Sequence, residues 1–81
     1  MQIDFKLTLE AARKNAGYTQ EEAAKAIGVH YQTIASWEKD SSDLSVRESN
    51  KLARLYHVPA NILFFGNKNE FIRNLRNKEF V

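Results

Sequence analysis

The sequence predicts an all-α fold, a compact domain of five helices with room for a further short helix at its C-terminal end. The chain contains only three glycines and one proline, the residues that most often end helices, and the segments between them begin with helix-capping signals. Hydrophobic residues make up 43% and charged residues 27% of the 81 positions, which suits one small domain rather than two. The chain has no cysteine, so neither a disulfide nor a cysteine-ligated zinc ion can support the core, and packing must do so alone.

Clear end signals delimit the first two helices. Residues 9–16 form the first, between a threonine N-cap and Gly17, a residue that readily takes the left-handed conformation of a helix C-terminus. A capping box that begins at Thr19 opens the second helix, which covers residues 20–27. Gly28 ends this helix in the same way as Gly17 ends the first.

The third helix follows after a turn of only Val29 and His30. Ile34 and Trp37 share one of its faces, and the helix extends to Lys39 before a short polar loop. A second capping box, at residues 45–48, opens the fourth helix. Its apolar face is expected to carry Leu52, Leu55 and Tyr56.

The last part of the chain is less strongly patterned. Pro59 suits the first turn of a short fifth helix that ends at Leu63, and Gly66 closes a core of residues 7–66. We interpret residues 1–81 as one domain in which the tail, 67–81, either folds back or contacts a second copy. Its apolar residues are Phe71, Ile72, Leu75, Phe80 and Val81, and the first three have helical spacing. Alternating apolar residues, Ile3, Phe5 and Leu7 near the start and Ile62 and Phe64 later, predict a small strand pair that joins the two ends.

The charge balance allows a polyanionic partner without demanding one. Lysine and arginine number 12 against 10 acidic residues, a net charge of +2 and a pI near 9.0, so any affinity for phosphates depends on where the positive groups lie. No apolar run approaches the roughly 20 residues needed to cross a bilayer, and the first residues do not resemble a secretory signal. We therefore expect no membrane partner and a cytoplasmic location.

Residues 20–39 carry the most informative pattern, because the turn between the second and third helices is too short for an antiparallel pair. The two helices should cross steeply, as in a helix-turn-helix, with small Ala24 at the crossing. The buried seam is predicted to be Ala23, Ile27, Val29, Ile34 and Trp37. The opposite side of the third helix then faces outward with Tyr31, Gln32, Ala35 and Ser36, whose amide and hydroxyl groups suit the edges of DNA bases.

A set of residues spread over 9–63 carries a family resemblance. It comprises Arg13, the run 17–24, Ile27-Gly28-Val29, Thr33-Ile34-Ala35-Ser36-Trp37-Glu38, and Leu52-Ala53 through Val58. In these residues the sequence resembles the Cro and phage-repressor class of helix-turn-helix DNA-binding proteins, also called the XRE family. The family pattern has glycine and proline where this chain has Asp40 and Leu44, so we expect the loop after the third helix to differ in shape.

The resemblance implies roles for individual residues. Base reading in the major groove falls to Tyr31, Gln32 and Ser36, and phosphate contact to Thr19, Gln20, His30, Lys39 and Ser41. Arg13 and Glu38 correspond to a structural salt bridge that holds the recognition helix. The implied partner is double-stranded DNA, bound by a homodimer, and no cofactor is implied.

Some of these candidate site residues also have simpler structural interpretations. Gln20 could be an ordinary solvated helix residue, and Tyr31 could pack along its own helix. His30 and His57 lack a partner at ligand spacing, so we predict no metal site, and no nucleophile and base stand at usable spacing, so we predict no enzyme. The alternative function is a protein-interaction module, with a toxin or an anti-repressor as the partner.

Overall fold

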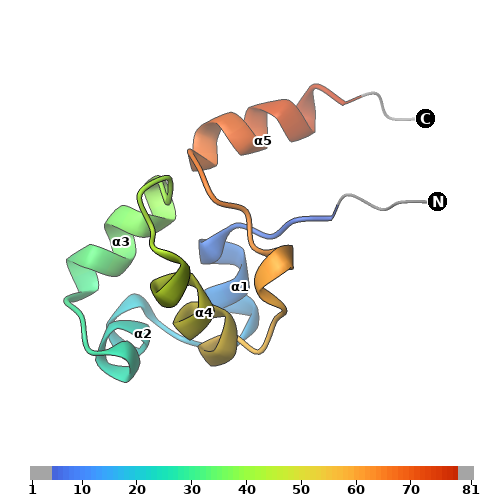
Figure 1. Cartoon of the computed structure of the whole chain (residues 1–81). Helices are drawn as coiled ribbons and strands as arrows, with labels where there is room; N and C mark the ends of the chain where they lie inside the picture. The colour runs from blue at the N-terminus through green and yellow to red at the C-terminus, as the bar shows by residue number, and fades with distance from the viewer. Residues whose placement is uncertain (1–4, 79–81) are drawn as a thin grey trace.

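The computed structural model describes residues 5–78, which form helices joined by loops, with no strand beyond isolated bridges (Figure 1). Five are α-helices and one is a single 3-10 turn. In order they are α1 (Leu9–Asn15), α2 (Gln20–Ile27), α3 (Tyr31–Lys39), α4 (Val46–Leu55), η1 (Ala60–Ile62) and α5 (Lys68–Arg76). The all-α prediction is confirmed, and the first four helices lie where the capping signals placed them.

Side-chain caps fix the starts of α1, α2, α4 and α5. The Thr8 hydroxyl accepts from the Ala11 amide at 3.1 Å before α1. Before α2, Thr19 and Glu22 form both hydrogen bonds of the capping box, at 2.9 and 3.0 Å. Gly28 then ends α2 with φ of +78°, the left-handed conformation that directs the chain into α3. These local signals set the short turn between α2 and α3.

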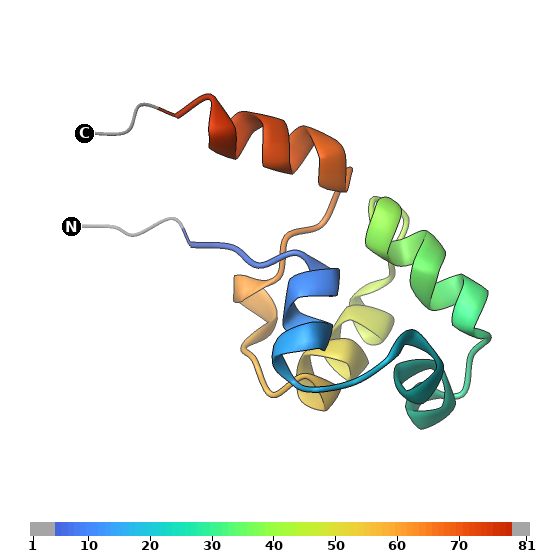
Figure 2. The same cartoon turned by 180° about the vertical axis from the view of Figure 1, so that it is seen from behind.

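The crossing of α2 and α3 is close because small residues lie between the helices. Ala23 and Ala24 are buried on α2, and Ile34 is buried on α3. The other predicted seam residues, Ile27, Val29 and Trp37, are partly buried and pack against the same core. Figures 1 and 2 show α2 and α3 joined by a short turn, with α1 and α4 packed behind them. This arrangement leaves one side of α3 uncovered.

The predicted fifth helix is wrong in type and length. Residues 60–62 form one 3-10 turn rather than an α-helix, and Leu63 is already extended. Leu63 leaves the helical conformation because it forms a parallel bridge with Leu7, in which the Leu7 amide donates to Ile62 at 2.8 Å. The Phe64 amide donates back to Leu7 at 2.7 Å. The predicted strand pair is thus reduced to one bridge within residues 5–78, and Ile3 lies outside the described residues.

The tail contains a helix, α5, capped by the Asn67 side chain, which accepts from the Glu70 amide at 3.0 Å. The start of α5 folds back on the domain. Phe71 lies against Phe64 with ring centroids 4.3 Å apart, and Lys68 pairs with Glu10 of α1 at 3.0 Å. The far half projects beside the N-terminal segment (Figures 1 and 2) and leaves Ile72 and Leu75 exposed, while Phe80 and Val81 fall outside the described residues.

Candidate nucleic-acid interface

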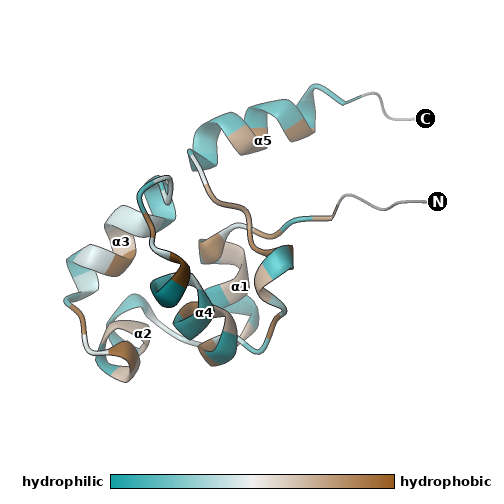
Figure 3. Cartoon of the chain, in the orientation of Figure 1, coloured by the Kyte–Doolittle hydropathy of each residue, from teal (hydrophilic) through white to brown (hydrophobic). Residues whose placement is uncertain are grey.

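The uncovered side of α3 is polar. Tyr31, Gln32 and Ser36 are exposed on it, and Tyr31 keeps 47% of its surface accessible. Gln32, Ala35, Ser36 and Lys39 line one shallow hollow along the helix, at positions that share a face. Figure 3 shows α3 mostly in teal and white, in contrast to the brown segments of the interior. The structure therefore brings Gln32 and Ser36 together on one accessible surface, while Tyr31 is exposed at the start of α3 and lines a separate hollow with His30.

A buried ion pair holds α3 from behind. The Arg13 Nε donates to Glu38 Oε2 at 2.6 Å and Arg13 Nη2 donates to Oε1 at 3.2 Å, with the two side chains 8% and 5% exposed. The carboxylate raises the pKa of the Arg13 guanidinium, chiefly through these hydrogen bonds, so the guanidinium stays charged. The predicted Arg13–Glu38 salt bridge is present, and it joins α1 to the end of α3.

Gln20 belongs to the same network, which the sequence did not reveal. Its Nε2 donates to Glu38 Oε1 at 3.0 Å, so the buried carboxylate receives hydrogen bonds from α1 and α2 together. Arg13 also donates through Nη1 to the Tyr18 carbonyl at 2.8 Å, just before α2. Three helices are thereby fixed around one carboxylate. The Gln20 amide nitrogen has a second hydrogen, so this role leaves a donor for another acceptor.

The other predicted phosphate contacts, except Ser41, lie on the surface around this face. Thr19 is exposed, although its backbone amide is occupied by Glu22. His30 is exposed as the N-cap of α3 and makes no capping hydrogen bond with its side chain. Lys39 is exposed at the opposite end of α3. His30 and Lys39 thus lie at opposite ends of α3.

Ser41 is in the wrong place for a phosphate contact. It is 3% exposed, and its hydroxyl accepts from the Gly66 amide at 2.9 Å while lying 3.4 Å from the Gly66 carbonyl. This side chain braces the loop after α3 against the chain that leads into α5. The prediction for Ser41 is therefore wrong, because the hydroxyl points into the protein and already has partners there.

The loop departs from the family pattern without strain. Asp40 has φ of −152°, an extended conformation that any residue adopts, so the family's glycine is not needed here. The Ser42 hydroxyl and amide both donate to the Asp40 carboxylate, and these bonds lower its pKa. Leu44, where the family has proline, packs partly buried against the core.

Two further findings concern the described part of the chain. Residues 5–78 contain no cluster of three or more histidine, cysteine or acidic side chains that could hold a metal ion. None of the helices described there has the length and apolar character required to cross a membrane.

Comparison with known proteins agrees with this geometry. A family model described as helix-turn-helix matches residues 9–63. The HTH-type transcriptional regulator ImmR of Bacillus subtilis is 36% identical over 55 residues, which are 68% of this chain but only 43% of ImmR, so the chain spans less than half of that relative. An uncharacterized HTH-type transcriptional regulator of Archaeoglobus fulgidus is 38% identical over 58 residues, 72% of this chain and 83% of the relative. Since the matched region includes all of α1 through η1, the chain belongs to the helix-turn-helix family, in which the second helix of the motif enters the major groove of DNA.

Proposed function

We propose that this protein binds double-stranded DNA in a sequence-specific manner and regulates transcription. The observation that carries the proposal is the exposed polar face of α3, held in place by the buried Arg13–Glu38 pair. Both relatives are named transcriptional regulators, which favours this function over the alternative of an antitoxin or another protein-interaction module.

Base reading is assigned to three side chains of α3. Gln32 can donate and accept together on an adenine edge, and Ser36 can do either with several bases. Tyr31 adds a ring that can contact the thymine methyl group and a hydroxyl that can hydrogen-bond. All three are exposed: Gln32 and Ser36 share one side of the helix, and Tyr31 lies at its first turn beside His30.

Phosphate contacts from both ends of α3 would set the register of the protein on the duplex. His30 is the N-cap at the start of α3, whereas Gln20, next to Thr19, is bonded to Glu38 near the end of α3, where Lys39 lies. Gln20 would connect phosphate to the buried Glu38 network, so the same side chain would bind DNA and position α3.

The protein is proposed to act as a cytoplasmic homodimer on two half-sites about one helical turn apart. One module of this size makes limited contact with DNA, and a second copy supplies the rest. Phe5, Ile72 and Leu75 leave apolar surface on the side of the domain away from α2, which suits a contact between copies.

Selection of binding sites from random duplexes at two salt concentrations tests the proposal. We expect an enriched sequence motif and a steep fall of affinity with salt, because base contacts produce the first and phosphate contacts the second. The variant Gln32→Ala should reduce the preference for that motif over a scrambled duplex by about 1 to 3 kcal/mol, with little change in nonspecific affinity. Asn50→Ala, at an exposed position of α4, is the matched control. Equal loss by Gln32→Ala on all duplexes would contradict base reading by this residue.

A further inference from the structure

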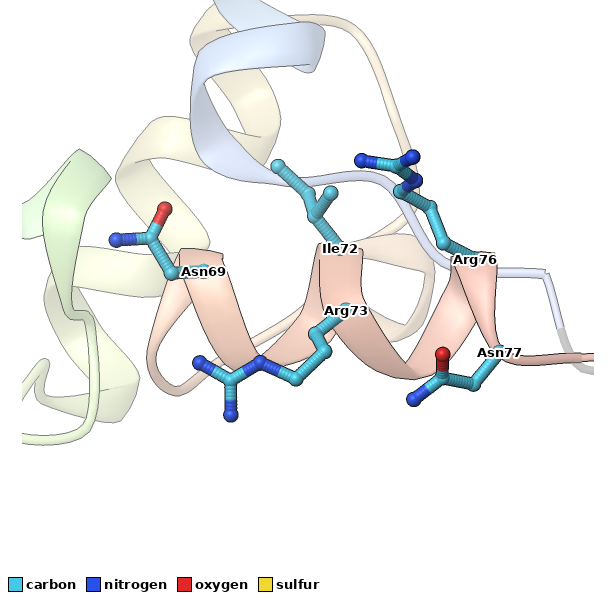
Figure 4. Close-up of a pocket in the computed structure, with 5 residues that line it drawn as sticks. All are labelled: Asn69, Ile72, Arg73, Arg76 and Asn77. Atoms are coloured by element: carbon cyan, nitrogen blue, oxygen red, sulfur yellow. The ribbon is translucent and has the colours of Figure 1, made fainter.

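Helix α5 has a polar face that the helix-turn-helix motif does not use. Asn69, Arg73, Arg76 and Asn77 recur at spacings of three to four residues and so share one side of the helix, where they line a hollow together with Ile72. In Figure 4 the Arg73 and Asn77 side chains extend away from the rest of the domain, whereas Asn69, Ile72 and Arg76 project on the side toward it. The opposite side carries Phe71 and Leu75, which line an apolar hollow against the N-terminal segment.

The position of this face relative to α3 is fixed by several contacts. Asp40, directly after α3, forms an antiparallel bridge with Asn67, directly before α5. The Ser41 amide donates to the Gly66 carbonyl at 2.9 Å, and the Ser41 hydroxyl accepts from the Gly66 amide. Helix α5 therefore begins beside the end of α3, where Lys39 is exposed, and continues outward from there (Figures 1 and 2).

The two arginines of this face carry charge that the described chain does not neutralise. Arg73 and Arg76 are exposed, and among residues 5–78 no carboxylate lies within salt-bridge distance of either. In contrast, Lys68 on the inner side of α5 is paired with Glu10. Asp40, directly after α3, accepts its hydrogen bonds from Ser42 and not from either arginine.

This chemistry matches phosphate oxygens in particular. A guanidinium presents a planar set of donors that fits a phosphate group, and asparagine amides add neutral donors beside it. Exposed arginines are also found on ordinary solvated surfaces and at contacts with acidic proteins. What favours DNA is position, since the face continues from the end of the helix assigned to base reading.

We propose that the α5 face formed by Asn69, Arg73, Arg76 and Asn77 contacts the DNA backbone beyond the base pairs read by α3. The inference rests on the proposed DNA-binding function. Nine helical residues span about 13 Å, the axial length of about four base pairs, so the additional contacts fall on a short flank next to each half-site. Phe71 and Leu75, on the apolar side of α5, do not line this hollow, so the proposed DNA contact leaves them available for a second copy.

The test compares the full chain with the double variant Arg73→Gln/Arg76→Gln. Each phosphate contact adds about 0.9 to the magnitude of the slope of log affinity against log salt, so the double variant should reduce that magnitude by about 1.8. Its affinity should fall equally for the selected and the scrambled duplex. Lys51→Gln/Arg54→Gln removes the same charge from exposed positions of α4 that line a hollow with α2 and not with α5, and it should leave the slope nearly unchanged. An equal effect of the two double variants would overturn the proposal, because the arginines would then act only through net charge.

Duplex length gives an independent readout. Removing about four base pairs from the outer flank should weaken DNA binding by the unaltered protein but leave the affinity of the Arg73→Gln/Arg76→Gln variant unchanged. Equal sensitivity of both proteins would contradict the assignment of this flank to α5. Circular dichroism and sedimentation confirm that the variant keeps its helices and its assembly state. The two proposals fail differently: if only the α5 contact is absent, the enriched motif and its loss in Gln32→Ala persist, whereas failure of the proposed function removes the motif itself.

Discussion

Replacing Glu38 with glutamine tests how far the buried network supports the fold. The substitution preserves size and removes the charge, so the Arg13 guanidinium, 8% exposed, is left without its counter-ion. In the unaltered protein both Glu38 carboxylate oxygens accept hydrogen bonds, from Arg13 at 2.6 and 3.2 Å and from Gln20 at 3.0 Å. A glutamine at position 38 has only one side-chain oxygen to accept these hydrogen bonds. Its NH2 group would face an N–H donor of Arg13 or Gln20 and could not bond to it.

The expected loss of unfolding free energy is about 3 kcal/mol, the lower end of the range for breaking a buried pair, because both side chains keep a small exposed fraction. In a domain of this size that loss corresponds to a fall in Tm of about 12 to 24 °C. Urea denaturation followed by circular dichroism measures the free energy directly. Glu21→Gln, an exposed glutamate on α2, is the matched control and should change stability by less than about 0.5 kcal/mol.

A double variant separates the charge from the packing. Arg13→Met/Glu38→Leu replaces the pair by apolar groups of similar size and should lie within about 1 kcal/mol of the unaltered protein, since removing both charges also removes the cost of burying them. At a temperature where it is folded, it should still bind its DNA site more weakly, because α3 loses the contacts that set its angle. A loss below about 1 kcal/mol in Glu38→Gln, or a double variant as unstable as the single one, would refute this reasoning.

Two other substitutions test contacts that attach α5. Ser41→Ala leaves the partly buried Gly66 amide without its acceptor and should lower the free energy of unfolding, measured by urea denaturation, by about 1 to 3 kcal/mol. The salt dependence of DNA binding should not change, and a change would contradict the structural role of Ser41. Ser42→Ala, at an exposed position, is the control. Glu10→Gln removes the ion pair with Lys68, which lowers the pKa of Glu10 below its ordinary 4.5. A lowered folded-state pKa adds stability above pH 4.5 that is lost as the pH falls through the folded value, so the unaltered protein should be more stable than Glu10→Gln by less than about 1 kcal/mol at pH 7, with the gap closing in acid. A gap that stays constant with pH would show that the effect does not come from the carboxylate charge.

The features predicted correctly from the sequence are those with local causes. Capping boxes at Thr19 and Ser45 and a glycine at position 28 act within a few residues, so the starts of α2 and α4 and the end of α2 could be predicted without knowing the tertiary structure. The outward direction of Gln32 and Ser36 followed from helical periodicity once Ile34 was assigned to the core. Periodicity also located α5, although not what it packs against.

The errors share a different cause, which is contact between distant parts of the chain. Leu63 is extended because of Leu7, and Ser41 is buried because of Gly66, pairs separated by tens of residues. The hydrogen bond from Gln20 to Glu38 belongs to the same class. A polar residue in a loop predicts exposure on average, and only the tertiary arrangement shows which serine finds a buried partner.

The arrangement of α3 separates the groups proposed to read DNA from the groups that hold the helix. Tyr31, Gln32 and Ser36 are exposed and make no side-chain hydrogen bond within residues 5–78, so changing them should alter sequence preference at little cost in stability. Glu38, near the end of the same helix, is bonded to Arg13 and Gln20, supports the fold and is too buried to touch a base. Gln20 is the exception, because it is bonded to Glu38 and stands where phosphate contact is proposed. A phosphate held by Gln20 would draw on the same amide that steadies α3, so DNA binding and the rigidity of the recognition helix should be coupled through this one residue.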